Sequence, residues 1–128
     1  MNNSKKIIET NTAPKAIGAY SQAVSFKNLF FTSGQIPLNP DSGTIISENI
    51  ENQIIQVLDN IENILISEGL TFKNILKLNV YLTDLNDFTL LNNIFIDRFK
   101  TEFPARSVVQ VSRLPKDSKV EIDAICCK

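Results

Sequence analysis

The chain has 128 residues, a length typical of one domain, and 43% of them are hydrophobic, enough for a core without disulfides. Its 13 Lys and Arg residues nearly balance its 14 Asp and Glu residues, which argues against a nucleic-acid partner, because such binders usually carry a basic face. The chain has no histidine, so acid-base chemistry must come from carboxylates, Lys, Tyr, Cys or water rather than from a histidine-based triad or pair.

Neither membrane nor metal binding is predicted. No stretch approaches the roughly 20 apolar residues that span a bilayer, and segment 1–11 lacks the apolar core of a signal peptide. We therefore expect a cytoplasmic protein. Cys126 and Cys127 are neighbours, for which a disulfide is strained, and two cysteines without histidine make a poor metal site.

The first two strands are expected within segment 20–34, on either side of a turn at Lys27 and Asn28. Gly34 closes the second of them. The following segment, 36–44, is rich in Pro, Asn, Asp and Gly, and this composition predicts a loop.

The next segment, 50–65, predicts an amphipathic helix, because apolar residues recur at steps of three and four. The residues of this stripe are Ile50, Ile54, Val57, Leu58, Ile61 and Leu65. Ser47, with Glu51 nearby, suits the start of the helix, and Gly69 suits its C-terminal cap.

Segment 75–83 alternates between apolar and polar residues, which predicts a strand. Its apolar face contains Leu76, Leu78, Val80 and Leu82. A second helix is expected from about Asn86, and Pro104 ends it. The apolar side of this helix contains Phe88, Leu91, Phe95 and Phe99. Two strands, 106–112 and 119–126, complete the chain.

This order of elements predicts an α+β domain over residues 1–128, in which a mixed sheet of about six strands carries both helices on one face. The other face has no cover within the chain. We expect it to carry Tyr81 and Val108 among mixed residues, and to be buried against other subunits of an oligomer.

The last two strands are expected to form an antiparallel hairpin whose register keeps charged residues out of the core. The helix-covered face then contains Val109, Val111, Val120 and Ile122. The uncovered face contains Arg106, Val108, Gln110, Glu121 and Asp123. A cation and a carboxylate on one face form either a cross-strand ion pair or a small-molecule site. The pattern alone leaves both interpretations open.

Five blocks that together cover almost the whole chain resemble one known family. They are AIGAYSQAV at 16–24, TSGQIPLNP at 32–40, DLNDF at 84–88, FPARS at 103–107 and RLPKDSKVEIDAI at 113–125. On these blocks the chain is similar to the RidA/YjgF/YER057c family of reactive-intermediate deaminases.

The resemblance implies a chorismate-mutase-like fold and a homotrimer with active sites in clefts between subunits. It also implies hydrolysis of 2-imino acids, such as 2-iminobutanoate and 2-iminopropanoate, to 2-oxo acids and ammonia. These imines come from enamines that pyridoxal-phosphate enzymes release. The reaction requires neither a metal nor an organic cofactor, and the imino acid is the expected partner rather than nucleic acid or a membrane.

The resemblance further implies roles for individual residues. Arg106 grips the substrate carboxylate, Glu121 orients the attacking water and assists proton transfer, and Tyr20 lines the pocket. Ser33 and Gly34 allow backbone groups to approach the substrate. Structural interpretations are also open: Tyr20 as an ordinary strand aromatic, Ser33 as a strand-end hydroxyl, and Gly34 as a turn residue with positive φ.

Two further positions concern substrate binding. Asn92 matches the asparagine after the DLNDF block and is expected either to contact the substrate or to lie on the helix surface. Val108 occupies the position where many members have a cysteine, which excludes a covalent thiol mechanism there and changes the pocket wall. The alternatives to an enzyme are a small-carboxylate-binding regulator and a chaperone-like protein on the same fold; a nuclease fits the acidic composition poorly.

Overall fold

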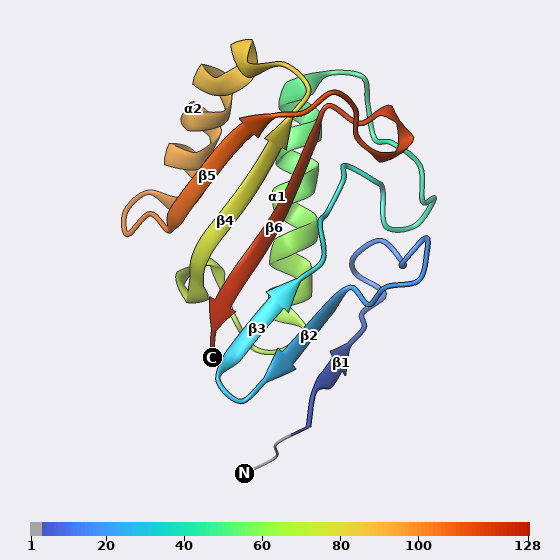
Figure 1. The fold of residues 1–128 in the computed structure, drawn as a ribbon, viewed down its shortest axis with the longest axis vertical. Coiled ribbons are helices and arrows are strands. Elements are labelled where there is room, and N and C mark those ends of the chain that lie inside the picture. The colour runs from blue at the N-terminus through green and yellow to red at the C-terminus, as the bar shows by residue number, and fades with distance from the viewer. Residues whose placement is uncertain (1–3) are drawn as a thin grey trace.

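The computed structural model describes residues 4–128 and contains one six-stranded sheet with two α-helices on one face (Figure 1). The helices are α1 (Ile50–Ile66) and α2 (Phe88–Phe99). The strands are β1 (Lys6–Ile8), β2 (Ala23–Phe26), β3 (Leu29–Thr32), β4 (Ile75–Leu82), β5 (Ala105–Gln110) and β6 (Val120–Cys127). The predicted α+β architecture is confirmed, although the sequence patterns did not reveal β1. Neither helix within 4–128 is long and apolar enough to cross a membrane.

The strand order is β1-β2-β3-β6-β4-β5, so the predicted hairpin of the last two strands is wrong. β4 and β5 are parallel, with α2 between them in the chain, and β6 pairs antiparallel with both β3 and β4. Parallel strands need a crossover connection, which α2 supplies. β5 therefore lies at the edge of the sheet, and β6 runs through its middle.

The parallel pairing also reverses the predicted faces of β5. Arg106 lies opposite Leu78, which is fully buried beneath the helices. Val108 is the next residue on this side and packs against the core. Arg106 and Val108 therefore face the helix layer and not the uncovered face. Val109, which the hairpin register placed in the core, faces the uncovered side and is 46% exposed.

Strand alternation holds throughout β6 and breaks at one point in β4. The residues of β6 that are buried against the helices are Val120, Ile122, Ala124 and Cys126. Glu121 and Asp123 lie on the uncovered face, as predicted. In β4, an irregularity between Ile75 and Lys77 turns Leu76 out of the expected apolar face and leaves it 50% exposed.

Helix α1 buries the apolar stripe that its sequence predicts. The buried residues of that stripe are Ile54, Val57, Leu58, Ile61 and Leu65. The N-cap is Asn49 rather than Ser47, and its side chain accepts the backbone N–H of Asn52 at 3.0 Å. Gly69 follows the helix with a φ of 74°, the left-handed conformation expected of a residue that closes a helix.

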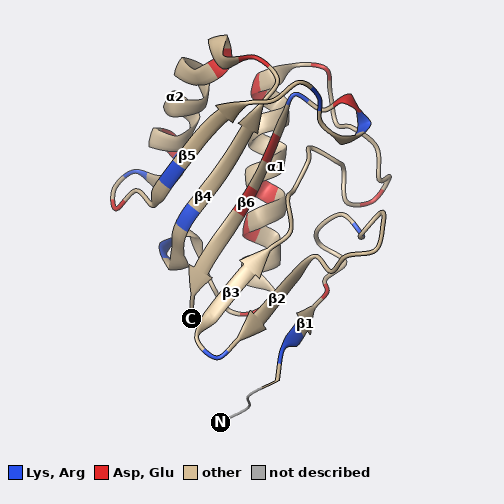
Figure 2. Cartoon of the chain, viewed as in Figure 1, with Lys and Arg blue, Asp and Glu red and all other residues tan. Residues whose placement is uncertain are grey.

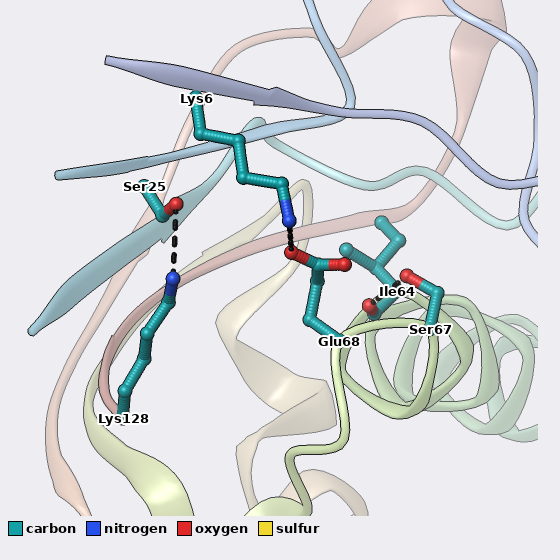
Figure 3. Close-up of polar contacts among 6 residues, drawn as sticks. All are labelled: Lys6, Ser25, Ile64, Ser67, Glu68 and Lys128. Carbon is teal, nitrogen blue, oxygen red and sulfur yellow. Dashed lines mark hydrogen bonds and ion pairs between the residues drawn. The ribbon is translucent and has the colours of Figure 1, made fainter. Parts of the chain in front are cut away.

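An ion pair and a hydrogen bond connect the first two strands of the sheet to segments far away in the sequence (Figure 3). Lys6 Nζ lies 2.6 Å from Glu68 Oε1, which connects β1 to the turn after α1. Lys128 Nζ donates to Ser25 Oγ at 3.2 Å, which connects the end of β6 to β2. Because the Lys6 side chain is largely exposed, its pair contributes at most about 1 kcal/mol.

A buried amide holds the loop that leads from β1 toward Tyr20. Gln22 is only 3% exposed, and its Nε2 donates to the carbonyl oxygens of Thr10 and Pro14 at 3.0 and 2.7 Å. Its Oε1 accepts the Thr10 N–H at 2.7 Å. One side chain thus satisfies several backbone groups of a loop that has no strand partners of its own.

We expect Gln22→Ala to lower the free energy of unfolding by about 1–3 kcal/mol, because the carbonyl groups of Thr10 and Pro14 lose their buried donor. Urea unfolding followed by circular dichroism measures this change. Asn11→Ala, an exposed position in the same loop, is the matched control and should change stability by less than about 0.5 kcal/mol. Equal stability of the two variants would contradict the anchoring role of Gln22.

Candidate active site

A pocket of about 240 Å³ lies where the chain leaves β3 and runs beside β6. Its lining residues are Ile17, Tyr20, Ser33, Gly34, Ile36, Pro115 and Glu121. This pocket brings together four of the residues that the sequence singled out: Tyr20, Ser33, Gly34 and Glu121. We call it the Glu121 pocket.

The carboxylate of Glu121 lies directly against the backbone of Gly34. A Cβ atom on Gly34 would be 2.7 Å from Glu121 Oε2, a distance that real Cβ atoms do not adopt. The backbone N–H groups of Gln35 and Ile122 each donate to the other's carbonyl oxygen, at 2.8 and 3.1 Å, which holds Gly34 beside β6. Gly34 does not have a positive φ, so the glycine is required for close approach and not for a left-handed turn.

Tyr20 and Ser33 lie in the wall of the Glu121 pocket. Tyr20 is 45% exposed, and its hydroxyl accepts the N–H of Ile17 at 3.1 Å, which orients the ring. The Ser33 hydroxyl donates to the carbonyl of Ser21 at 2.5 Å, and the Ser33 N–H donates to Gln22 at 2.9 Å. Both Ser33 donors are therefore used within the protein, and its hydroxyl oxygen is left to accept.

The environment of Glu121 favours its protonated form. Burial raises the pKa of Glu121, and the negative charge of Asp123, two residues along the same face, raises this pKa further. Asn79 Nδ2 donates to Asp123 Oδ1 at 2.8 Å and holds that carboxylate in place. The pKa of Tyr81, which lies opposite Glu121 on β4, is also raised; the negative charge of Asp123 is the larger cause and burial is the next. A carboxyl group with a raised pKa is suited to proton exchange with a substrate.

A second pocket, of about 310 Å³, lies at the edge of the sheet between α2 and β5, and we call it the Arg106 pocket. Its lining residues are Asn92, Phe95, Ile96, Phe103, Pro104 and Arg106. The guanidinium group lies 5.3 Å from the ring centroid of Phe88 and 5.2 Å from that of Phe95. Burial lowers the pKa of Arg106, and no carboxylate of residues 4–128 forms an ion pair with it.

The two pockets lie on opposite faces of the sheet within one chain. Figure 2 shows acidic residues along β6 and a basic segment where β5 begins, with β4 between them. Arg106 and Asn92 line one pocket, whereas Glu121 and Tyr20 line the other. The predicted common face of Arg106 and Glu121 is therefore wrong, because β6 pairs with β4 and parallel pairing turns Arg106 toward α2.

Val108 lines neither of these pockets, because its half-buried side chain packs against the core. Sequence reasoning missed several apolar wall residues. Phe103 and Pro104 lie in the FPARS block immediately before Arg106, and Pro115 lies in the RLPKD block, so their place in the same blocks was the available signal. Ile17 likewise lies in the AIGAYSQAV block that contains Tyr20.

The thiol groups are poorly placed for chemistry in either pocket. Cys126 faces the core, and burial raises the pKa of its thiol to about 12. Cys127 is partly exposed on the other face of β6. Within 4–128, no group of three or more His, Cys, Asp or Glu side chains could hold a metal ion.

A family model described as Endoribonuclease L-PSP matches residues 10–128. The chain belongs to the RidA/YjgF family. The solved structure of the Rid-family protein YyfA from Yersinia pestis has a TM-score of 0.95 and 47% identity, and the match covers 98% of this chain and 100% of that one.

Two further relatives concern activity and ligands. The human 2-iminobutanoate/2-iminopropanoate deaminase is 43% identical over 121 residues, which cover 94% of this chain and 88% of the human protein. Escherichia coli TdcF, solved with bound serine, has a TM-score of 0.89 and 45% identity over 96% of this chain and 98% of that one. The chain thus belongs to a family that includes imine deaminases and proteins that bind small-molecule ligands.

We expect Gly34→Ala to displace the Glu121 carboxylate, because the new Cβ would lie 2.7 Å from its Oε2. A crystal structure of the variant should show the carboxylate rotated away from β3. Gly18→Ala is the matched control, since a Cβ at that position meets its nearest atom at an ordinary 3.5 Å. If the carboxylate keeps its position in Gly34→Ala, the backbone around residue 34 must have shifted instead, which would contradict the prediction.

Proposed function

We propose that this protein hydrolyses 2-imino acids to 2-oxo acids and ammonia, with 2-iminobutanoate and 2-iminopropanoate as substrates. The observation that carries the proposal is a pair of complementary half-sites: an arginine that forms no ion pair with a carboxylate of residues 4–128, and a carboxyl group with a raised pKa. The name of the human relative supports the choice of substrates. The imines would come from enamines released by pyridoxal-phosphate enzymes in the cytoplasm.

The proposal includes a homotrimer in which the Arg106 pocket of one copy meets the Glu121 pocket of the next. Two half-sites on opposite faces of one chain cannot act on the same small molecule, whereas two copies can bring them together. The uncovered face also exposes large apolar side chains that packing between copies would bury. These are Ile7, Phe26, Leu29, Phe31 and Val109.

The proposed mechanism assigns each half-site one task. The guanidinium of Arg106 forms paired hydrogen bonds with the substrate carboxylate and fixes the imine carbon in position. Asn92 and the apolar wall of the same pocket surround the rest of the substrate. Tyr20 and Ser33, in the facing pocket, supply a ring surface and an acceptor oxygen beside Glu121.

Glu121, in its ionised form, accepts a proton from water while the water oxygen forms a bond to the imine carbon. It then passes this proton to the nitrogen of the tetrahedral adduct. Glu121 next accepts the proton of the new hydroxyl group and passes it to the amino nitrogen, the carbon–nitrogen bond breaks, and the oxygen becomes the carbonyl of the 2-oxo acid. Ammonia leaves, and Glu121 is ionised again. Holding water and imine together accounts for the acceleration of a reaction that also proceeds in water.

The nuclease description of the family model fits these pockets less well. The Glu121 pocket contains a carboxylate, and Asp123 adds a second one nearby, so both would repel a phosphate backbone. The Arg106 pocket offers one cation, which suits one carboxylate. We therefore favour a small imino acid over RNA as substrate.

We expect Arg106→Ala and Glu121→Gln each to lower imine hydrolysis at least about a hundredfold, because each removes one half of the site. The release of 2-oxo acid from freshly generated 2-iminobutanoate measures the activity. When the two variants are unfolded and refolded together, about a quarter of the sites should combine an intact Arg106 with an intact Glu121 from another copy. Activity should recover to about that fraction of the wild-type value.

Refolding each variant alone is the control for this mixing experiment and should restore no activity. Mixtures that stay inactive although trimers form would contradict a site shared between copies. Tight binding of the reaction product 2-oxobutanoate without imine turnover by the wild-type protein would favour the alternative of a carboxylate-binding regulator.

We expect Asp123→Asn to shift the acidic limb of the pH–rate profile to lower pH. Activity requires ionised Glu121 and is lost as the pH falls through the pKa of this group. Because the charge of Asp123 raises that pKa, its removal lowers the pKa and extends activity to more acidic conditions. Asp97→Asn, on the exposed surface of α2, is the control. An unchanged acidic limb would mean that the charge of Asp123 does not influence the pKa of the group that limits activity at low pH.

A further inference from the structure

A third pocket, of about 400 Å³, lies outside both half-sites, between α1, the turn Phe72–Asn74 and the C-terminal end of α2. The rings of Phe72 and Phe99 stack with centroids 4.9 Å apart, and we call this pair the aromatic floor. Both rings are partly buried against the core. The guanidinium of Arg98, which also lines the pocket, lies 5.3 Å from the Phe72 ring centroid, so a ligand could cover the apolar surface of the floor that Arg98 does not.

Charged groups of both signs surround the aromatic floor. Lys73 and Lys100 line the pocket, and neither forms an ion pair with a carboxylate of residues 4–128. Glu62 and Glu102 line it as well. Glu62 lies 3.7 Å from Arg98, whose closer partner is outside the pocket, so the Glu62 carboxylate can accept further hydrogen bonds.

The backbone at the rim of this pocket has an uncommon conformation. Lys100 and Glu102 have φ values of 65° and 54°, in the left-handed region that side chains rarely adopt. Lys100 ends α2 four residues before Pro104, earlier than the sequence predicts, and its N–H donates to Ile96 at 2.9 Å. Such strained residues cluster where ligands bind, and here they place a cation and a carboxylate at one rim.

We propose that this pocket binds a free α-amino acid with an apolar side chain. The ligand carboxylate pairs with Lys73 and Lys100. The ligand ammonium group pairs with Glu62 and Glu102, and its side chain packs on the aromatic floor. A zwitterion is the matching class, because it pairs with the lysines and with the glutamates, whereas a simple anion or a simple cation leaves one of the two sets unpaired. Arg98 also lines the pocket, but its charge is already paired with Asp59 at 2.9 Å.

The third pocket is connected to Arg106 by two sets of contacts. The ring of Phe99 lies 5.4 Å from that of Phe95, which in turn lies 5.2 Å from the guanidinium of Arg106. Segment 100–104 also lines both pockets, with its first part in the third pocket and its last part in the Arg106 pocket. A ligand on the aromatic floor is therefore expected to change the surroundings of Arg106.

A titration of the intact ¹⁵N-labelled protein with L-leucine tests the proposal. The backbone amide signals of Thr101 and Glu102 should shift and saturate, and the side-chain Nε–H signal of Arg106 should shift with the same apparent Kd. Two analogues lack one charge each: 4-methylpentanoate has no ammonium group, and 3-methylbutylamine has no carboxylate. Each should bind at least about tenfold more weakly than leucine.

Variants separate this pocket from the half-sites. The double variant Lys73→Gln, Lys100→Gln should weaken leucine binding about tenfold, whereas Lys5→Gln, an exposed lysine on another part of the chain, should not change it. Arg106→Ala should keep the shifts at Thr101 and Glu102. The proposal is overturned if these signals do not saturate, if both analogues bind as well as leucine, or if binding depends on Arg106 and not on the two lysines.

Discussion

The alternation of β6 is the constraint on which both the core and the candidate site depend. The helix-facing side of β6 buries Val120, Ile122 and Ala124. The residues between them therefore face the uncovered side of the sheet. A shift of one residue would bury Glu121 and Asp123 without partners, which costs several kcal/mol. Because β6 has a strand on each side, this register is held from both directions. Glu121 is thus positioned by the same packing that makes the fold stable.

The close contact of Glu121 with Gly34 has an energetic consequence. Burial raises the pKa of Glu121 above its value in the unfolded chain, so the folded state binds this proton more tightly. The ionised carboxylate therefore costs stability at neutral pH, and this cost disappears as the pH falls below the unfolded pKa. Asp123 increases the cost. Other interactions in the sheet have to offset this cost. Glu121 lies on β6, which is paired with a strand on each side.

Helix α2 contributes to the candidate chemistry through its aromatic residues rather than through charged ones. Phe88 and Phe95 flank the guanidinium of Arg106, and Phe99 continues the row of rings toward the third pocket. These rings exclude water from one side of the cation without neutralising its charge, so Arg106 stays available to an external carboxylate. The apolar stripe that attaches α2 to the sheet therefore also forms the wall of the Arg106 pocket.

Local patterns in the sequence determined the helices, most of the strands and the identity of the candidate residues. The three- and four-residue spacing of α1 and the alternation of β6 depend only on neighbours along the chain, and the family blocks identified Tyr20, Arg106 and Glu121. The tertiary structure decided which strands are neighbours. Placing β6 beside β4, and β5 at the edge, turned Arg106 to the face opposite Glu121.

The wrong face of β5 has a physical reason. Val109 is apolar, and a rule that assigns apolar residues to the core of the same chain places it inside. On an edge strand with one uncovered face, Val109 lies on the surface of its own chain, where the proposed packing between copies would bury it. The sequence does not distinguish burial within one chain from burial between copies. Strand pairing joins residues that are far apart in the chain, so only the folded backbone settled which face of β5 belonged to the core.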